Sequence, residues 1–153
     1  DDHTFVATED KSNVVNKNYA ITPLVSDFNQ DGYLDLVWVN MAGPSKVFIN
    51  KGGENNYLQL TFTENSENIG AKIKVVTSAG KIITEDYVIG EGLVSDQSAT
   101  IHIGLGKDTI KSVEISYING TIQNLNDIKI NSRTVVPKVI TLKVEGSKTE
   151  IIE

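Results

Sequence analysis

The feature that most constrains the fold of this chain is a series of short apolar segments separated by polar turns. Seven segments of this kind show little helical periodicity: Tyr57–Phe62, Lys72–Thr77, Lys81–Val88, Thr100–Ile103, Ser112–Tyr117, Arg133–Val136 and Val139–Val144. Evenly spaced short strands with polar turns are typical of β-sandwiches and β-barrels. We therefore predict an all-β chain whose main part is an antiparallel β-sandwich or barrel.

A further β-hairpin is expected before this series. The segment Leu34–Val39 carries apolar residues on both faces, with Trp38 among them, so it should be a strand packed on both sides and Trp38 should be core. Met41–Pro44 is expected to form a turn, and Lys46–Asn50 should return as the second strand. A hairpin of two strands is not stable alone, so it should belong to something larger.

These segments divide the chain into three expected parts. Residues 1–52 should form a partial repeat with a propeller-blade-like hairpin, 53–136 the main β domain, and 137–153 a strand or tail. The first 20 residues are polar and read as a loose entry segment. Ile21–Val25 is a short apolar run that Pro23 interrupts, so it carries no strand prediction.

The stretch between Ser26 and Leu36 holds the one motif with explicit chemistry. Calcium prefers six to eight oxygen ligands, and alternating positions of a tightly curled loop direct oxygens to one centre. Gly32, at the sixth loop position, permits the sharp reversal that such a loop needs. The expected ligands are the side chains of Asp27, Asn29 and Asp31, the carbonyl of Tyr33, and the side chain of Asp35.

The charge around the loop favours the same interpretation. No Lys or Arg occurs from Asn18 through Ser45, so a bound cation is the natural counter-charge for the three carboxylates. The motif is not an EF-hand, because its twelfth position is Trp38 on a strand instead of a Glu on a helix. The alternative is a solvated turn, since Asp, Asn and Gly favour turns for local reasons.

Two stretches resemble known families. Residues 22–50, with Val47-Phe48-Ile49-Asn50 closing the segment, resemble one FG-GAP/VCBS-type propeller repeat. The acidic loop of that family binds calcium, which the resemblance assigns here to Asp27, Asn29, Asp31, Tyr33 and Asp35. A propeller needs several blades, and this chain has room for about one.

The following blocks are Asn68–Val75, Gly90–Ser98, His102–Gly106 and Val113–Gly120. Their order resembles the ASPIC/UnbV domain, which typically follows such repeats in secreted proteins, including the cartilage acidic protein group. The likeness covers roughly residues 57–136. Tyr117-Ile118 replaces the usual Trp-Pro, and Ile103 replaces an aromatic residue. The resemblance implies association or adhesion and not a reaction.

Composition excludes several classes of protein. The formal charge of −6 and the absence of any long basic run argue against a nucleic-acid partner. The chain has no cysteine, so disulfides and thiolate metal sites are excluded. No apolar run approaches the ~20 residues of a membrane span. Since the chain lacks an initiator Met and a signal peptide, we expect a portion of a longer, processed protein.

Other polar residues give weaker signals. Ser95, Asp96 and Gln97 lie beside a glycine-rich stretch and could face a ligand, although a surface loop with local hydrogen bonds is the favoured interpretation. His102 is expected to have a structural role, because its only fellow lies near the N-terminus. Gly104–Gly106 should be a tight turn, and Asn119-Gly120 favours a type I′ hairpin turn over its reading as a glycosylation sequon.

We therefore expect a non-catalytic, calcium-binding module, secreted or at the cell surface, that serves adhesion or protein interaction. The alternative is a carbohydrate-binding module of a larger secreted enzyme or surface complex, with an extracellular glycan as partner. Flat aromatics such as Tyr33 and Trp38 could then stack on sugar rings. A hydrolase would need carboxylates paired across a cleft, and no such pairing is visible in the sequence. The identity of the partner and the oligomeric state are left open.

Overall fold

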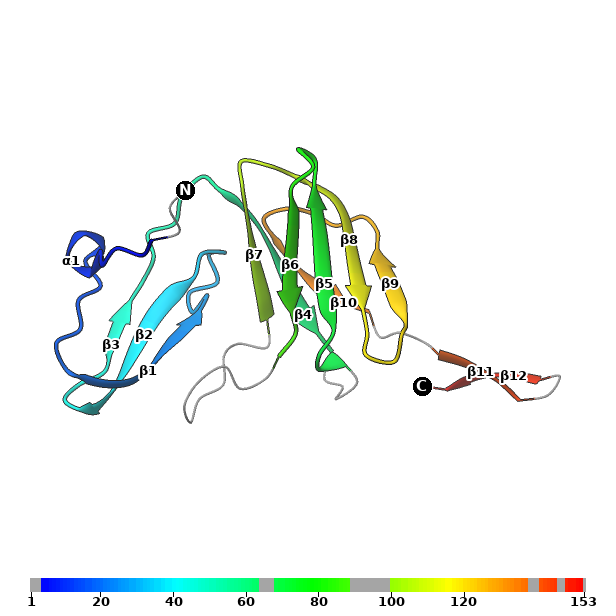
Figure 1. The fold of residues 1–153 in the computed structure, drawn as a ribbon, viewed down its shortest axis with the longest axis horizontal. Helices are drawn as coiled ribbons and strands as arrows, with labels where there is room; N and C mark the ends of the chain where they lie inside the picture. The colour runs from blue at the N-terminus through cyan, green and yellow to red at the C-terminus, as the bar shows by residue number, and fades with distance from the viewer. Residues whose placement is uncertain (1–3, 64–67, 89–99, 138–140, 146–147, 153) are drawn as a thin grey trace. The chain divides into compact units, whose positions relative to one another are not determined.

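The computed structural model of the chain describes residues 4–63, 68–88, 100–137, 141–145 and 148–152 (Figure 1). It is an all-β structure with one short helical turn, α1 (Glu9–Ser12). The chain divides into two compact units, and their described parts begin at Thr4 and at Glu54. Among the described residues, no helix is long and apolar enough to cross a bilayer.

The first unit contains a three-stranded antiparallel sheet in the order β1-β2-β3 (Figure 1). Its strands are β1 (Tyr19–Ser26), β2 (Asp35–Ala42) and β3 (Lys46–Phe48). The expected hairpin is present as β2 and β3, but β1 was not predicted as a strand because of Pro23. Proline is tolerated at a sheet edge, where its missing N–H removes no ladder bond, and β1 is an edge strand.

The turn between β2 and β3 differs from the prediction. β2 extends through Ala42, so Met41 and Ala42 are strand residues, and the chain reverses at Gly43. Gly43 has a φ of 93°, a conformation that residues with a Cβ rarely adopt. The pairing partners of β2 therefore decide where this strand ends.

The described part of the first unit buries no apolar side chain. Its buried side chains are those of Thr22 and Asp35, at 7% and 2% exposure. Trp38 is only half-buried, and its indole Nε1 donates a hydrogen bond to the Val14 carbonyl at 3.3 Å. The prediction that Trp38 is a core residue is therefore wrong for this structure, because within the first unit the described residues supply no second layer over this strand.

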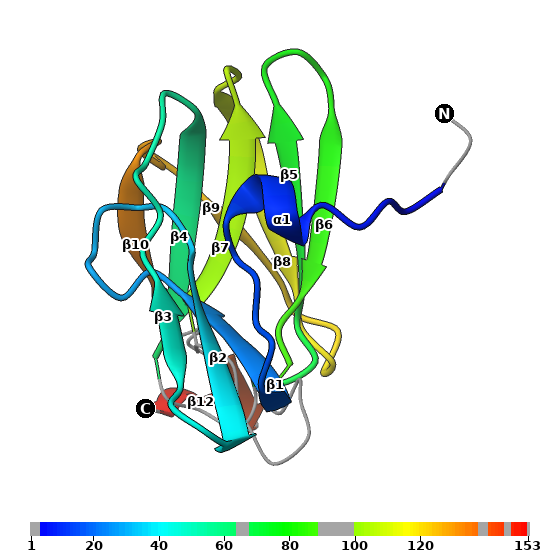
Figure 2. The same ribbon diagram turned by 90° about the vertical axis from the view of Figure 1, so that its left-hand side faces the viewer.

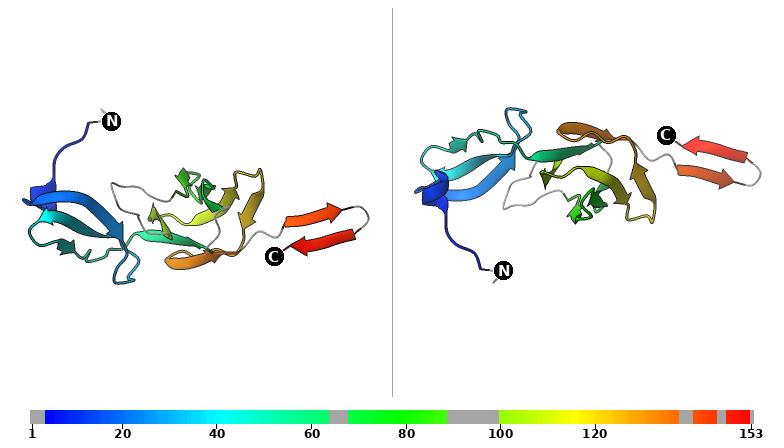
Figure 3. Two further views of the ribbon diagram at one scale, coloured as in Figure 1. Left: turned by 90° about the horizontal axis from the view of Figure 1, so that it is seen from below. Right: turned by 90° about the horizontal axis from the view of Figure 1, so that it is seen from above.

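The second unit is a β-sandwich. One sheet has the order β10-β4-β7 and the other the order β6-β5-β8-β9 (Figures 2 and 3). The strands are β4 (Asn56–Phe62), β5 (Lys72–Thr77), β6 (Ile82–Asp86), β7 (Thr100–Gly106), β8 (Ile110–Ser116), β9 (Ile122–Leu125) and β10 (Ser132–Val136). In the described residues these strands form two separate sheets and not a closed barrel.

The buried core of the sandwich draws on both sheets. Leu58 and Leu60 from one sheet, and Val75 and Ile115 from the other, are fully buried. The alternation of apolar and polar residues along these strands places every second side chain inward. This alternation is the reason that the sandwich could be predicted from the sequence.

Three details of the second unit differ from expectation. β4 pairs with β10 in parallel, although an antiparallel arrangement was predicted. β7 runs to Gly106, so Gly104 is a strand residue and the tight turn predicted at Gly104–Gly106 is wrong; the chain turns just afterwards, where the Asp108 amide donates to the Leu105 carbonyl at 3.2 Å. β9 was not predicted, because its four residues alternate too briefly to stand out.

The turn at Asn119-Gly120 is present, but it is not of type I′. The Gly120 amide donates to the Tyr117 carbonyl at 3.0 Å, and the Tyr117 amide donates to the Thr121 carbonyl at 2.8 Å. Gly120 has a φ of 85°, whereas Asn119 does not have a positive φ. A type I′ turn requires positive φ at both central residues, so this is a longer turn with glycine at its left-handed position.

The C-terminal strands β11 (Thr141–Glu145) and β12 (Lys148–Ile152) pair with each other in an antiparallel hairpin. The predicted strand at residues 139–144 is thus present from Thr141, and residues 138–140 lie outside the described part. Among the described strands, β11 and β12 pair with no strand of the sandwich.

Candidate metal centre

The predicted calcium loop connects β1 to β2 and is tightly curled. Gln30 and Gly32 both have positive φ, at 61° and 91°. Two left-handed residues so close together reverse the chain within a few positions. This curl brings side chains from alternating positions over one short stretch of backbone.

Asp27 organises the curl from its first position. Its Oδ1 accepts a hydrogen bond from the Asp31 amide at 3.0 Å, and its Oδ2 accepts one from the Gly32 amide at 2.9 Å. Asp27 therefore fixes the backbone of the loop through both of its carboxylate oxygens.

Asn29 and Asp31 fold over the same backbone. The Asn29 Oδ1 accepts from the Asp31 amide at 3.2 Å, and the Asn29 Nδ2 donates to the Asp31 Oδ2 at 2.8 Å. The Asp31 Oδ1 accepts from the Tyr33 amide at 2.9 Å. Both side chains are exposed, so they form the outer part of the loop.

Asp35 lies at the base of the loop and has a role that sequence reasoning missed. Its Oδ2 accepts from the Phe28 amide at 2.9 Å, and its Oδ1 accepts from the Asn50 amide at 2.8 Å. The Asn50 side chain in turn donates to the Leu34 carbonyl at 3.2 Å. Through these two bonds the buried Asp35 joins the loop to the chain beyond β3. Because each of its oxygens already accepts an amide, Asp35 would have to share an oxygen with any cation.

Tyr33 is held by the residues that follow β3. Its hydroxyl donates to the Gly53 carbonyl, and its ring lies against Gly52. A Cβ on Gly52 would lie 3.3 Å from the Tyr33 ring, so glycine allows this close approach. The ring is thus used for packing, and the assignment of the Tyr33 carbonyl as a ligand stays a prediction.

The donor set fits a hard cation in part. Two carboxylates and one amide oxygen, from Asp27, Asp31 and Asn29, share the curled loop, and oxygen is the donor that calcium prefers. Among the described residues, however, no three His, Cys, Asp or Glu side chains gather closely enough to hold a metal ion. A cation here would depend on amide and carbonyl oxygens as well as on the carboxylates.

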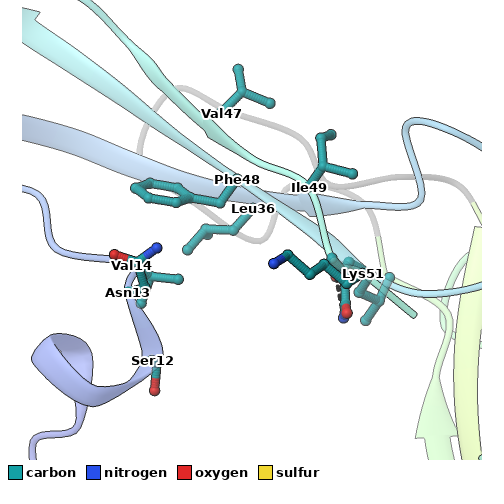
Figure 4. A pocket seen from close by; sticks show the side chains of 10 residues that line it. Ser12, Asn13, Val14, Leu36, Val47, Phe48, Ile49 and Lys51 are labelled. Carbon is teal, nitrogen blue, oxygen red and sulfur yellow. Dashed lines mark hydrogen bonds between the residues drawn. The ribbon is translucent and has the colours of Figure 1, made fainter. Parts of the chain in front are cut away.

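An apolar groove lies beside the loop in the same unit, with a volume of about 660 Å³ (Figure 4). Leu36 and Phe48 point toward Asn13 and Val14, whereas Val47 points away from them (Figure 4). Of the residues that line the groove, only Lys51 is titratable. The groove therefore offers apolar contact without an acid–base pair.

The weaker candidates have different outcomes. Ser95, Asp96 and Gln97 lie outside the described residues. His102 is half-buried, its ring stacks on Tyr57 with centroids 5.5 Å apart, and its Nδ1 lies 3.5 Å from the Gln59 Nε2. These contacts agree with a hydrogen-bonded structural histidine, although its partner is a neighbouring strand and not a glycine turn.

Comparison with known sequences identifies relatives of this chain. The sequence profile of the family described as ASPIC and UnbV matches residues 61–144, which is more than half of the chain. Cartilage acidic protein 1 from Homo sapiens is 33% identical over 109 residues, covering 67% of this chain and 16% of that protein. The Xenopus tropicalis protein of the same name is 33% identical over 116 residues, covering 71% and 18%.

The chain thus spans less than a fifth of the length of these relatives. The Mus musculus protein of the same name gives a similar match, at 33% identity over 103 residues. The similarity is therefore to one portion of each relative.

Proposed function

Because the chain belongs to the ASPIC and UnbV family, we propose that it is a non-catalytic, calcium-binding extracellular module that serves adhesion or protein interaction. The named relatives are cartilage acidic proteins, and this name supports a secreted or cell-surface location. The observation that carries the calcium proposal is the convergence of Asp27, Asn29 and Asp31 on one curled loop.

The first unit supports the same proposal because the apolar side chains of its sheet are not buried in the described residues. Its sheet carries apolar residues on both faces, since Leu36 pairs with Phe48 and Val37 with Val47, yet the described part of the unit buries none of them. A sheet of this kind is stable when further layers cover it. We therefore propose that residues 22–50 are one FG-GAP/VCBS-type repeat that packs against further blades of a longer protein.

The proposal of a non-catalytic role is supported by the chemistry of the groove and of the loop. The groove beside the loop has Lys51 as its only titratable lining residue. In the loop, Asp27 and Asp35 already accept two backbone hydrogen bonds each. Carboxylates committed in this way position the backbone and suit a structural cation better than proton transfer.

Calcium titration of the full chain tests this function. Isothermal titration calorimetry should give one site with a dissociation constant of about 10⁻⁴ to 10⁻³ M, the range of extracellular calcium modules. Asp31→Asn should weaken binding, and Asp86→Asn should leave it unchanged, because Asp86 is an exposed carboxylate on β6. If calcium gives the same binding heats with Asp31→Asn as with the parent chain, the loop does not hold the cation and is a solvated turn.

A second candidate function, carbohydrate binding, is supported by one observation in the second unit. The rings of Tyr57 and His102 stack with an interplanar angle of 15° on the outer face of the sandwich, beside the hydrogen-bonding side chain of Gln59. Aromatic rings with polar neighbours suit the apolar faces and hydroxyls of sugars.

A further inference from the structure

The turn between β8 and β9 contains a modification motif that the proposed function does not use. Asn119-Gly120-Thr121 is the only Asn-X-Ser/Thr sequence in the 153 residues of the chain. This motif is the acceptor sequence of N-linked glycosylation when it lies at the surface of a secreted protein. The sequence favours a turn at this place over modification, but a surface turn and an acceptor site do not exclude each other.

The backbone of this turn is held by its own hydrogen bonds. The Gly120 amide donates to the Tyr117 carbonyl at 3.0 Å, and the Tyr117 amide donates to the Thr121 carbonyl at 2.8 Å. Gly120 takes the left-handed conformation, with a φ of 85°, which reverses the chain. The shape of the turn therefore does not use the side-chain nitrogen of Asn119.

A second turn of the sandwich shows that this backbone shape does not require the motif. Between β5 and β6, the Gly80 amide donates to the Thr77 carbonyl, and the Thr77 amide donates to the Lys81 carbonyl, both at 2.9 Å. Gly80 has a φ of 86°. The third and fifth residues of that turn are Ala79 and Lys81. Turn geometry alone thus does not explain an asparagine and a threonine at the same places between β8 and β9.

The Asn119 side chain is exposed and oriented by one hydrogen bond. Its Oδ1 accepts from the Thr121 amide at 2.9 Å, which is an Asx-turn contact. Since a backbone amide can only donate, the Asn119 oxygen must face it, and Nδ2 is the other branch of the carboxamide. In the described part of the chain, no group accepts a hydrogen bond from Nδ2. Nδ2 is the atom that carries the sugar in an N-linked glycan.

The surroundings of Asn119 leave room for a bulky group. The turn lies at one end of the second unit (Figure 1). Ile118 is 76% exposed and Ile122 is 60% exposed, and a Cβ built on Gly120 would meet no atom within 4 Å. A glycan on Asn119 would lie beside two apolar side chains that otherwise face water.

Deamidation is the other reaction open to an exposed Asn-Gly pair. In deamidation, the glycine backbone nitrogen attacks the side-chain carbonyl carbon of the asparagine, and ammonia leaves. Here the Gly120 nitrogen already donates to the Tyr117 carbonyl, and the Thr121 amide holds the Asn119 carboxamide. The attack would have to break this arrangement, so the structure favours modification at Nδ2.

We propose that Asn119 is an N-glycosylation site with its Nδ2 as the acceptor atom. In the transfer, Nδ2 loses a proton and bonds the anomeric carbon of an oligosaccharide. The bond from that carbon to the diphosphate of a lipid-linked donor breaks, and the lipid diphosphate leaves. The site rests on the extracellular location in the proposed function and does not depend on calcium.

The experiment expresses the full chain behind a cleavable signal peptide in cultured animal cells. Intact-mass spectrometry, on protein from the medium and from the cells, should show the added mass of one N-linked glycan. Peptide N-glycosidase F should remove it. Digestion in ¹⁸O-labelled water should leave an ¹⁸O-labelled aspartate at position 119, which separates a removed glycan from earlier deamidation.

Three substitutions locate the acceptor. Asn119→Gln and Thr121→Ala should each abolish the added mass, because the first removes the acceptor and the second removes the hydroxyl that the motif requires. Thr121→Ser should retain it, because the motif accepts serine. The turn bonds of Thr121 are made by its backbone, so both threonine variants should fold, and circular dichroism melts measure this.

The turn between β5 and β6 provides the matched control. Ala79→Asn with Lys81→Thr, made in the Asn119→Gln background, places the same motif on the same backbone shape at another exposed turn. This variant should regain the mass of one glycan.

Each other outcome overturns the proposal. A parent chain without added mass would do so whether or not the control turn is modified. An added mass that persists in Asn119→Gln would place the sugar on another residue. Deamidation at position 119 without a glycan would show that the turn reacts through the Gly120 nitrogen. None of these results bears on calcium, which the titration of Asp31→Asn tests separately.

Discussion

The two units of this chain are stabilised by different interactions. The second unit buries a continuous apolar core between two sheets, with Leu58, Leu60 and Ile115 fully enclosed. In the described part of the first unit, the buried side chains are Thr22 and Asp35, and its loop is organised by carboxylates that accept backbone amides.

This difference teaches where each unit is vulnerable. Burial of apolar area stabilises a domain without a ligand, at roughly 25 cal/mol per Å². Carboxylates bonded to amides stabilise a local turn but supply little of that driving force. The second unit should therefore fold on its own core, whereas the first should depend on a cation and on further layers.

The largest effect should come from the core of the second unit. Ile115→Ala should destabilise that unit by about 2–5 kcal/mol, because it removes a fully buried side chain and leaves a cavity. Urea unfolding measures the loss. Ile122→Ala is the matched control at 60% exposure, and it should change stability by less than about 0.5 kcal/mol. Similar losses for the two variants would mean that the sandwich core is misassigned.

Asp35 should be the most sensitive position of the first unit. Asp35→Ala leaves the amides of Phe28 and Asn50 without their acceptor, which should cost about 2–3 kcal/mol. Measured in EDTA, the effect excludes any lost metal ligand. Asp35→Asn keeps one acceptor oxygen and should lose less. A calorimetric melt in which neither variant lowers the first unit's transition would contradict its role as a clamp.

Calcium should act on one unit only. At millimolar concentration it should stabilise the first unit by about 1–2 kcal/mol, given the affinity of extracellular sites, and leave the sandwich transition unchanged. Differential scanning calorimetry with calcium and with EDTA measures both transitions. If calcium shifts the sandwich transition as well, the two units are coupled and the comparison between them fails.

The smallest effect concerns Asp108, whose pKa is lowered by the side-chain hydrogen bond of Thr77 and then by the amides of Thr109 and Ala79. A lowered pKa stabilises the folded state above the ordinary value of 3.8, and this stability is lost as pH falls through the lower folded value. The second unit's melting temperature should therefore drop more steeply below pH 4 in the parent chain than in Asp108→Asn. Parallel pH profiles would contradict this role.

Much of the sandwich could be predicted because its signals are local. Lys72–Thr77 was predicted with the bounds that the structure gives, since alternation and polar turns show both ends of that strand. β1 was missed because a proline in a strand depends on whether the strand lies at an edge. The incomplete burial of Trp38 was also missed, because burial depends on layers that the strand itself does not contain.

The candidate site residues also divide into those that the sequence indicates and those that only the structure brings together. The pattern of oxygen-bearing residues in the loop is a local property, and the spacing of Asp27, Asn29 and Asp31 could be read directly. The double contact of Asp35 could not, because Asn50 reaches it across 15 positions. The contact of Arg133 with Gln59 spans 74 positions and depends on the parallel pairing of β4 with β10.

Residue order by itself determined that this protein is all-β and that one loop concentrates oxygen donors, because both follow from contacts between near neighbours in the chain. Only the tertiary structure decided which apolar strands are buried and which distant side chains meet in a row. Those outcomes depend on strand pairing and on the layers that pack together, and a single segment carries neither.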